Sequence, residues 1–517
     1  MPDTTSQPIY RTADIRTIES LAAAAGPSPT LMERAGLAAA QIARERLLAD
    51  RRSVMVIAGP GNNGGDGFVV ARHLKQWWYR VSVLFTGDAT RLSDDARGAC
   101  DAWLAAGGTL TERLPEQPSD LVVDALFGIG LTRSVEGRHA ELIEWMNRQR
   151  APVLSLDIPS GLAADTGAVL GHAVRATLTV TFIALKPGLL TLDGPDHVGE
   201  WIVADLGLDV ESLQPPMGRV IGAEHLAHVL APRLRNSHKG SFGSLGIVGG
   251  AAGMTGAALL TGRAALQLGA GRIYLGLLRK DLGVDPIQPE LMLREADETV
   301  EMPNLNCLVV GPGLGQSPPA RSAVARALER DAPLVLDADA LNVLGAHEAL
   351  RDACRARRAA TLLTPHPAEA ARLLNSDTAA VQADRVQSAL ELALRYRAAV
   401  ALKGAGTVVA TPDGHWSVNL TGNPGLASAG MGDVLSGICG ALLAQSVEPY
   451  AALSAAIHLH GRAADVCAEM LGGWIGMTAS EVTAAARGVL NDAVYGKPAR
   501  GGFTLAEGAR SACRGRS

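Results

Sequence analysis

The chain has 517 residues, of which 47% are hydrophobic, 19% are charged and 58 are glycine. This length exceeds what one hydrophobic core usually organises, and the composition is typical of α/β domains rather than of a disordered or coiled-coil protein. The formal net charge of −5 excludes a general attraction to nucleic acid or to an anionic membrane, so small molecules are the expected partners.

The N-terminus lacks the basic-then-apolar pattern of a signal peptide. Charges, prolines or glycines interrupt every apolar run before it reaches membrane-spanning length. The six cysteines lie far apart without a CxxC pair, which predicts reduced thiols. We therefore expect a cytoplasmic protein that does not contact membranes.

The first half of the chain alternates apolar strands with helical segments, after a helical stretch LMERAGLAAAQIARERLL. Strands are predicted at 53–58, 81–85, 121–125, 153–157, 178–183 and 201–204, and helices at 66–77, 93–106 and 136–149. This alternation is typical of right-handed βαβ units that form a mostly parallel sheet. It predicts an α/β, Rossmann-like three-layer sandwich.

The stretch DVESLQPPMGRVIG, at about 209–222, breaks this rhythm with a proline pair and predicts a domain boundary. The alternation then restarts with the short apolar strands SLGIVGG, RIYLGLL, CLVVGPGLG, PLVLDAD, ATLLTPH and VALKGAG. We predict one domain over residues 1–215 and a larger α/β domain over residues 222–505.

Polar residues follow three strands of the first domain, at the edge where open α/β sheets bind ligands. GPGNNGGDG follows the first strand, Asp124 lies in VVDALFGIGL at the third, and Asp157 and Ser160 lie in SLDIPSGL after the fourth. Glycines in each loop let backbone amides approach a ligand. We expect these loops to form one site.

The glycine loop carries more side-chain polarity than the pyrophosphate of an ordinary dinucleotide enzyme requires, because it contains Asn62, Asn63 and Asp66. Oxygens of Asn63, Asp124 and Ser160 suit a hard cation, which leaves Asp157 for acid–base work. Alternatively, Asp124 and Asp157 cap helices and the asparagine pair forms a turn. This structural alternative explains any one of these residues taken alone better than it explains all of them together.

In this order, GPGNNGGDG, DALFGIGL and DIPSGL resemble the NAD(P)H-hydrate epimerase domain over residues 10–208. Such domains interconvert the R and S forms of NAD(P)H hydrated at C6 of the nicotinamide. The resemblance implies that Asp157 faces the reacting ring and that Asn63, Asp124 and Ser160 bind potassium. It also implies ligand contacts from Asn62, Asn63, Gly64, Gly65, Asp66, Gly128, Ile129, Gly130, Leu131, Thr132, Arg133, Ser134 and Asp157.

The strongest pattern of the second half is NPGLASAGMGDVLSGICGALLA, at 423–444. Its glycines lead into an apolar helix that is predicted to begin near Asp433. Free amides and the positive helix end can bind an anion there while Asp433 removes a proton. No GxxxxGK[ST] motif occurs, which disfavours a P-loop nucleotidase.

Together with SHKGSFGSLGIVGG, VVGPGLG, LDADALN, TPHPAEAARLL and LKGAGTVVA, this segment resembles the ribokinase-like superfamily and, within it, the ADP-dependent NAD(P)H-hydrate dehydratases. The resemblance covers residues 236–440. It implies that the nucleotide is held by Lys403, Gly404, Ala405, Gly406, Thr407 and Gly432, and the hydrate by Ala257, Gly313, His366 and Asp433.

The dehydratase mechanism implied by the resemblance begins when Asp433 removes the C6 hydroxyl proton. The oxygen would attack the β-phosphoryl group of ADP, and the phosphate ester would eliminate. The products would be NAD(P)H, AMP and phosphate. The expected cofactors are Mg²⁺ at the dehydratase and K⁺ at the epimerase, with ADP as co-substrate.

Structural roles compete for several of these residues. Asp337 and Asp339 are interpreted as helix caps in preference to magnesium-linked groups. His366 lies between two prolines and orders a turn if it does not bind the hydrate. The apolar C-terminal helices leave room for a homo-oligomer, which we expect.

These patterns predict a bifunctional enzyme that epimerises NAD(P)H hydrates and dehydrates the S form. Two alternatives remain. The second half also suits a kinase of a vitamin alcohol or sugar, since the glycine loop and Asp433 serve phosphoryl transfer equally well. The first half also suits a non-catalytic Rossmann-like binding module, although the joint presence of Asn63, Asp124, Asp157 and Ser160 argues against lost chemistry.

Overall fold

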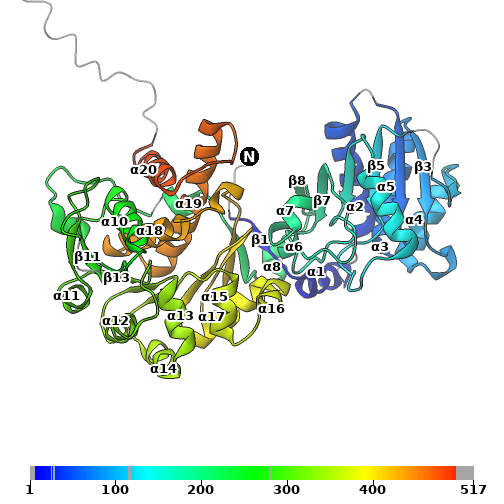
Figure 1. Ribbon diagram of the computed structural model, residues 1–517. Helices are drawn as coiled ribbons and strands as arrows, with labels where there is room; N and C mark the ends of the chain where they lie inside the picture. The colour runs from blue at the N-terminus through cyan, green and yellow to red at the C-terminus, as the bar shows by residue number, and fades with distance from the viewer. Residues whose placement is uncertain are drawn as a thin grey trace, which may run out of the picture.

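The computed structural model describes residues 6–496, apart from 25, 27–28, 50, 115–117, 228 and 279–281. The predicted domain end at residue 505 lies outside these residues. Figure 1 shows two α/β bodies side by side, so the predicted two-domain α/β fold is confirmed. Among the residues that the structure describes, no helix has both the length and the apolar character needed to cross a bilayer.

The first body contains a seven-stranded sheet in which all neighbouring strands are parallel. Its strands, in spatial order, are β4 (Leu110–Thr111), β3 (Arg80–Phe85), β2 (Ser53–Ala58), β5 (Leu121–Ala125), β6 (Val153–Leu156), β7 (Leu178–Phe182) and β8 (Glu200–Ala204). The chain order reverses between β2 and β5. In open α/β sheets this reversal leaves a crevice at the carboxyl ends of the strands.

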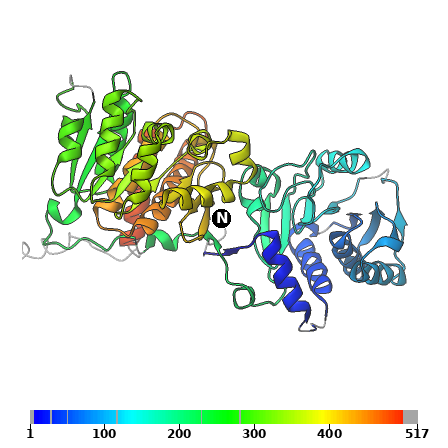
Figure 2. The ribbon, with the colours of Figure 1, turned by 90° about the horizontal axis from the view of Figure 1, so that it is seen from below.

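Helices cover both faces of this sheet, which explains why β2 is apolar and buried after Ser53. Val54 and Val56 pack in a core with α1 (Thr12–Ala24), α2 (Leu31–Ile42), α3 (Asn62–Gln76) and α4 (Asp94–Ala105). Met55 and Ile57 pack on the other face with α5 (Gly137–Asn147). Figure 2 shows α1 and α2, in dark blue, against this body. The predicted Rossmann-like three-layer arrangement is confirmed.

The second body contains an eleven-stranded sheet. In spatial order its strands are β1 (Pro8–Ile9), β9 (Gly218–Ile221), β18 (Trp416–Asn419), β17 (Thr407–Ala410), β16 (Ala399–Leu402), β15 (Thr361–Leu363), β14 (Leu334–Leu336), β13 (Cys307–Val310), β10 (Ser244–Gly249), β11 (Arg272–Leu277) and β12 (Met292–Glu295). The strands from β16 to β12 are parallel, and their chain order reverses between β10 and β13.

Two helical layers enclose the second sheet. One contains α10 (Thr255–Gln267), α18 (Met431–Ala444), α19 (Pro449–Leu471) and α20 (Ala479–Tyr495). The opposite layer contains α11 (Ala296–Glu301), α12 (Pro318–Leu328), α13 (Asp339–Ala346), α14 (Glu348–Ala356), α15 (Pro367–Leu374), α16 (Thr378–Ala383) and α17 (Arg385–Tyr396). Figure 1 shows the two layers above and below the strands.

The two bodies share structure at their junction. Strand β1 comes from the start of the chain but pairs with β9 of the second sheet. Leu185, Leu189 and Leu190, beside and within the short helix α6 (Pro187–Leu190), belong to the same apolar core as Leu402 of β16. A hydrophobic core therefore runs across the junction.

Candidate active sites

Asp124 and Ser160 meet at the carboxyl edge of the first sheet. Asp124 is the last residue but one of strand β5 and is fully buried. Its carboxylate accepts hydrogen bonds from Ser160 Oγ at 2.5 Å, Ser160 N at 2.9 Å and Ser155 Oγ at 2.8 Å. Burial raises the pKa of Asp124, although these hydrogen bonds act in the opposite direction. These partners exclude the alternative that Asp124 caps a helix.

The polar residues of the glycine loop lie in a helix, not in a loop. Helix α3 begins at Asn62, whereas the sequence predicted a start at 66. The helix can start this early because glycines let the backbone segments around its first turn pack closely. A Cβ atom on Gly64 would lie 2.0 Å from Gly59 O, and one on Gly59 would lie 1.8 Å from Leu126 O. Only glycine allows this close approach between the β2–α3 turn and the loop after β5.

Asn63 is the best-placed candidate ligand of α3. Its side chain is 7% exposed, and neither Oδ1 nor Nδ2 has a hydrogen-bond partner among the described residues. Leaving a buried amide unpaired costs about 1–3 kcal/mol, which indicates that a bound group pairs with it. Asn62 differs, since it is exposed and its Oδ1 accepts a hydrogen bond from Ser93 Oγ at 2.6 Å.

Asp157 directly follows β6 and has a left-handed backbone with φ of 66°. Its Oδ1 accepts hydrogen bonds from Lys186 Nζ at 2.5 Å and from Phe182 N at 3.4 Å, so Asp157 is not a helix cap either. Its Oδ2 faces Gly128 and Asn63, because a Cβ atom on Gly128 would lie 3.4 Å from both Asp157 Oδ2 and Asn63 Cβ. The structure thus brings three predicted residues together.

Two further carboxyl groups lie near Asp157. Burial, and then the charge of Asp157, raise the pKa of Asp66 well above its usual value and also raise the pKa of Glu19. Sequence reasoning did not single out Glu19 or Lys186. The rule that located Asp157 would have found Lys186, because this lysine follows the strand predicted at 178–183.

The remaining predicted contacts surround this cluster. Gly65 is buried, where a Cβ atom would press on Met32. The loop after β5 is more open: Gly128, Ile129 and Leu131 are half-buried, and Gly130, Thr132, Arg133 and Ser134 are exposed. An open loop beside buried polar groups leaves room for a large ligand.

In the second body, Asp433 lies in the first turn of α18, which begins at Met431. Gly430 precedes the helix with φ of 85°. Burial, and then the charge of Asp337, raise the pKa of Asp433 to about 6. A carboxylate at a helix N-terminus with this pKa is suited to act as a general base near neutral pH.

Asp337 pairs with Lys403 close to Asp433. Lys403 Nζ lies 2.8 Å from Asp337 Oδ1, and Ser436 Oγ donates a hydrogen bond of 2.7 Å to Asp337 Oδ2. A Cβ atom on Gly432 would lie 3.4 Å from Lys403 Nζ. These contacts bring the lysine turn and the α18 glycines together, as predicted.

The capping interpretation of Asp337 and Asp339 is wrong. The N-cap of α13 is Ala338, which has φ of 51° and no capping side chain. Asp337 instead binds Lys403 and Ser436, and Asp339 accepts a hydrogen bond from Gly315 N at 2.8 Å. Both carboxylates therefore connect site loops that are distant in the sequence.

The predicted hydrate contacts lie around the reversal point of the second sheet. A Cβ atom on Gly313, after β13, would lie 3.1 Å from Ala257 Cβ in α10. His366 caps α15, since its Nδ1 accepts hydrogen bonds from Ala368 N and Glu369 N. The turn-ordering role is therefore present. Burial, and then the charge of Lys403, lower the pKa of His366, so it also lies near the site.

The predicted nucleotide loop, Lys403–Thr407, joins β16 to β17. Below it, the buried guanidinium of Arg385 donates hydrogen bonds to Leu402 O at 3.1 Å and to Gly406 O at 3.5 Å. The first body contacts the loop as well, because Leu192 N donates to Ala405 O at 3.3 Å. The amino-acid sequence did not predict the contacts of Arg385 and Leu192 with this loop, because both residues come from distant segments.

The residues present differ in how well they fit the two expected cations. Asn63, Asp124 and Ser160 offer the kind of oxygens that K⁺ prefers, and the amide of Asn63 is unpaired, whereas Asp124 and Ser160 bind each other. Within the described ranges no group of three or more His, Cys, Asp and Glu side chains has metal-binding geometry. Mg²⁺ would therefore be held largely by the phosphates of the nucleotide, as is usual for this ion, with Asp337 and Asp339 as the nearby carboxylates.

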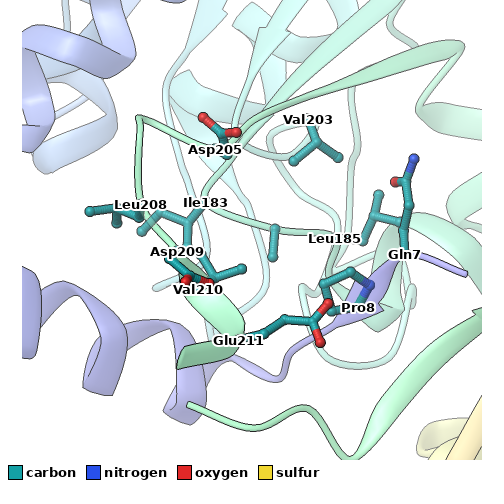
Figure 3. A pocket seen from close by; sticks show the side chains of 11 residues that line it. Gln7, Pro8, Ile183, Leu185, Val203, Asp205, Leu208, Asp209, Val210 and Glu211 are labelled. Carbon is teal, nitrogen blue, oxygen red and sulfur yellow. The ribbon is translucent and has the colours of Figure 1, made fainter. Parts of the chain in front are cut away.

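A separate cavity of about 340 Å³ lies at the junction of the two bodies. Figure 3 shows Gln7 and Pro8 on one side of it and Leu208 and Asp209 on the other, with Glu211 extending toward Pro8. None of the predicted site residues lines it.

Comparisons with known proteins cover both bodies. Residues 28–188 match the family described as YjeF-related protein N-terminus, and residues 245–486 match the family described as NAD(P)H-hydrate dehydratase. The chain is 41% identical to the Bifunctional NAD(P)H-hydrate repair enzyme Nnr of Escherichia coli (strain K12), over 90% of each chain. It is 37% identical to the protein of the same name from Coxiella burnetii, over 92% of this chain and 97% of that one.

Among solved structures, an ADP/ATP-dependent NAD(P)H-hydrate dehydratase from Bacillus subtilis, co-crystallized with ATP/Mg²⁺, is 28% identical. The match covers 53% of this chain and 98% of that chain, with a TM-score of 0.47.

Proposed function

The chain belongs to the bifunctional NAD(P)H-hydrate repair enzymes, and from this premise we propose that the Asp157 cluster carries out epimerisation and the Asp433 cluster carries out dehydration. The protein is an enzyme with two activities on NAD(P)H hydrates. The observation that carries the residue assignment is that each carboxylate lies at the carboxyl edge of its sheet, close to the reversal of strand order.

In the epimerase site, Asp157 exchanges a proton with the hydroxyl group at C6 of the hydrate. Reversible loss of this hydroxyl, or opening of the ring, makes C6 planar, so that either configuration can re-form. Asp157 Oδ2 is the oxygen open to the ligand, because Oδ1 is held by Lys186. The backbone of α3 and the loop after β5 bind the rest of the dinucleotide.

Potassium is proposed between Asn63, Asp124 and Ser160. These side chains supply the uncharged and charged oxygens that hard cations prefer. When bound, K⁺ supplies a fixed positive charge beside the ligand. The unpaired amide of Asn63 supports this assignment, since a cation would satisfy its Oδ1.

In the dehydratase site, Asp433 removes the C6 hydroxyl proton, and the oxygen attacks the β-phosphoryl group of ADP to release AMP. Amides at the start of α18 and the ammonium of Lys403 stabilise the charge of the transferred group. The resulting phosphate ester eliminates to give NAD(P)H. His366, Ala257 and Gly313 contact the hydrate, and residues 403–407 hold the nucleotide. Because the protein side chains alone do not form a magnesium site, we assign no step to Mg²⁺.

The test of both assignments uses purified protein, mixed R and S hydrates of NADPH, and ADP. Restored NADPH is followed by its absorbance, and AMP and phosphate are measured as products. Full recovery of both epimers is expected, whereas a stable phosphorylated product would favour the kinase alternative. Asp433→Asn should leave epimerisation intact and stop dehydration.

Asp157→Ala should give the reverse result, so that each variant serves as the control for the other. Loss of both activities in either variant, with the fold intact, would contradict the division of labour between the two sites. Unchanged epimerisation in Asp157→Ala would remove this residue from the reaction and favour the binding-module alternative.

Two further expectations stay predictions. The homo-oligomer is supported by exposed apolar side chains after α19, among them Trp474 and Ile475, and light scattering on the purified chain tests it. The cytoplasmic location is tested by fractionating cells that express the tagged chain.

A further inference from the structure

We propose that Lys186 is a positioning residue of the epimerase, which binds one oxygen of Asp157 and so directs the second oxygen toward the ligand. This inference rests on the proposed role of Asp157. It concerns a residue outside the motifs that identified the site, and it begins from the contacts of one buried ammonium group.

Lys186 is fully buried in the turn between β7 and α6. Its Nζ donates to three acceptors, which are Asp157 Oδ1 at 2.5 Å, Thr181 Oγ1 at 2.8 Å and Phe182 O at 2.7 Å. An ammonium group has three N–H bonds, so all its donors are used. Burying a lysine is costly unless its charge is paired, and Asp157 is its one carboxylate hydrogen-bond partner among the described residues.

The lysine fixes which oxygen of Asp157 can react. Oδ1 is occupied by Lys186 and Phe182 N, whereas Oδ2 points toward Gly128 and Asn63. The left-handed backbone at Asp157 is an uncommon conformation for a residue other than glycine, and it sets this direction. A carboxyl group with one oxygen bound and the other free can exchange a proton with the ligand only through the free oxygen.

Lys186 also counters the negative charge around Asp157. Glu19 of α1 and Asp66 of α3 face the same cluster, and Arg16 is the cation beside Glu19. The ammonium of Lys186 therefore supplies the positive charge that is in direct contact with Asp157 in this cluster of carboxyl groups.

The position of Oδ2 matters because the reaction uses Asp157 in both directions. When the C6–O bond breaks, the N1 electron pair forms the C6–N1 double bond and the departing hydroxide takes the proton that Asp157 Oδ2 carries, which makes it water. When water adds to the other face, the double-bond pair returns to N1 and the water gives a proton back to Asp157 Oδ2. An oxygen that pointed elsewhere could do neither step. No oxidant or reductant is needed.

The experiment compares wild-type protein with Lys186→Met and Lys186→Arg, as full-length chains. Epimerisation of R hydrate is measured as kcat and KM from pH 5 to pH 9. Loss of the ammonium should lower kcat at neutral pH by about 10²-fold with little change in KM, because general acid–base catalysis contributes at least this factor. Lys186→Arg, which keeps a cation able to bind Asp157 Oδ1, should restore kcat in part.

Two controls separate this role from a purely structural one. Dehydration of pure S hydrate reports that the chain is folded, since it uses the second body. Thr181→Val removes one partner of Lys186 without touching Asp157, and it should leave kcat close to the wild-type value. If Lys186→Met fails to fold, the values of kcat for Lys186→Arg and Thr181→Val still decide the question. A loss of kcat in Thr181→Val as large as that in Lys186→Arg overturns the proposal.

Failure of the underlying assignment gives a different result. If wild-type protein does not epimerise the hydrate, or if Asp157→Ala epimerises normally, the role of Asp157 is wrong. If both behave as expected and Lys186→Met keeps the wild-type kcat, only the role of Lys186 is wrong.

Discussion

Asp157 and Asp433 lie in different charge environments, although both are proposed to move a proton at C6 of the same hydrate. Asp157 is held by a buried lysine in direct contact. Asp433 lies beside Asp337, whose charge adds to burial and raises the pKa of Asp433 to about 6.

Dehydration should lose rate as the pH falls through about 6, because Asp433 must be ionised to accept the hydroxyl proton and its pKa is about 6. Below that value kcat/KM for S hydrate should fall about tenfold per pH unit. The measurement uses saturating ADP. ADP binding is measured at the same pH values, so that protonation of the nucleotide is distinguished from protonation of Asp433. A rate that stays constant down to pH 5 would contradict the role of Asp433.

Removing potassium should slow epimerisation and leave dehydration unchanged, because the proposed ligands Asn63, Asp124 and Ser160 all belong to the first body. Replacing K⁺ with a bulky organic cation tests this directly. Asn63→Ala should weaken the response to K⁺, whereas the exposed neighbour Asn62, whose Oδ1 binds Ser93, provides the matched control Asn62→Ala. Equal K⁺ dependence in both variants would exclude Asn63 as a ligand.

At the scale of elements, the first turn of α3 sets the epimerase site. The helix can start at Asn62 because Gly59 and Gly64 let β2, α3 and the loop after β5 approach at backbone distance. This early start turns Asn63 inward and exposes Asn62. The same two adjacent asparagines therefore have different environments.

Gly64→Ala should abolish epimerisation and destabilise the first body by about 1–3 kcal/mol, because its Cβ would lie 2.0 Å from Gly59 O and the strand or helix must move. The matched control is Gly61→Ala, whose Cβ would meet no atom within 4 Å. Urea unfolding gives the stability of each variant, and epimerisation gives the function. Equal behaviour of the two variants would disprove the packing argument.

At the scale of the whole molecule, the two bodies are joined by apolar packing more than by charge. The ion pair of Arg11 with Asp384 spans the junction at 3.0 Å, but its side chains are 27% and 32% exposed. Such pairs contribute about 0–1 kcal/mol. Leu189, in contrast, is 1% exposed in the core that continues into the second body.

Leu189→Ala should therefore lower the free energy of unfolding by about 2–5 kcal/mol and impair both activities, because a cavity forms between the domains. Arg11→Ala should cost less than about 1 kcal/mol and serve as the control at the same junction. Denaturant titrations that follow each activity measure both effects. A larger loss in Arg11→Ala would show that charge holds the junction.

Most of the sheet framework was predictable from the amino-acid sequence. The strands at 53–58 and 121–125 were predicted to the residue, since both are mostly apolar and end at polar or glycine-rich loops. The short strands β1 and β9 were missed. Strand β9 lies within the stretch that was predicted as a boundary, and β1 joins the sheet of the other body. Two to four residues carry too little periodicity to be recognised alone.

The amino-acid sequence by itself determined the two α/β domains and the loops that carry Asp157 and Asp433, because buried parallel strands and the residues after them leave local patterns. Only the tertiary structure decided what these residues touch. It paired Asp157 with Lys186, 29 positions away, and Asp337 with Lys403, 66 positions away. It also placed the first body against the nucleotide loop. Such pairings depend on which strand ends become neighbours, and no local pattern encodes that choice.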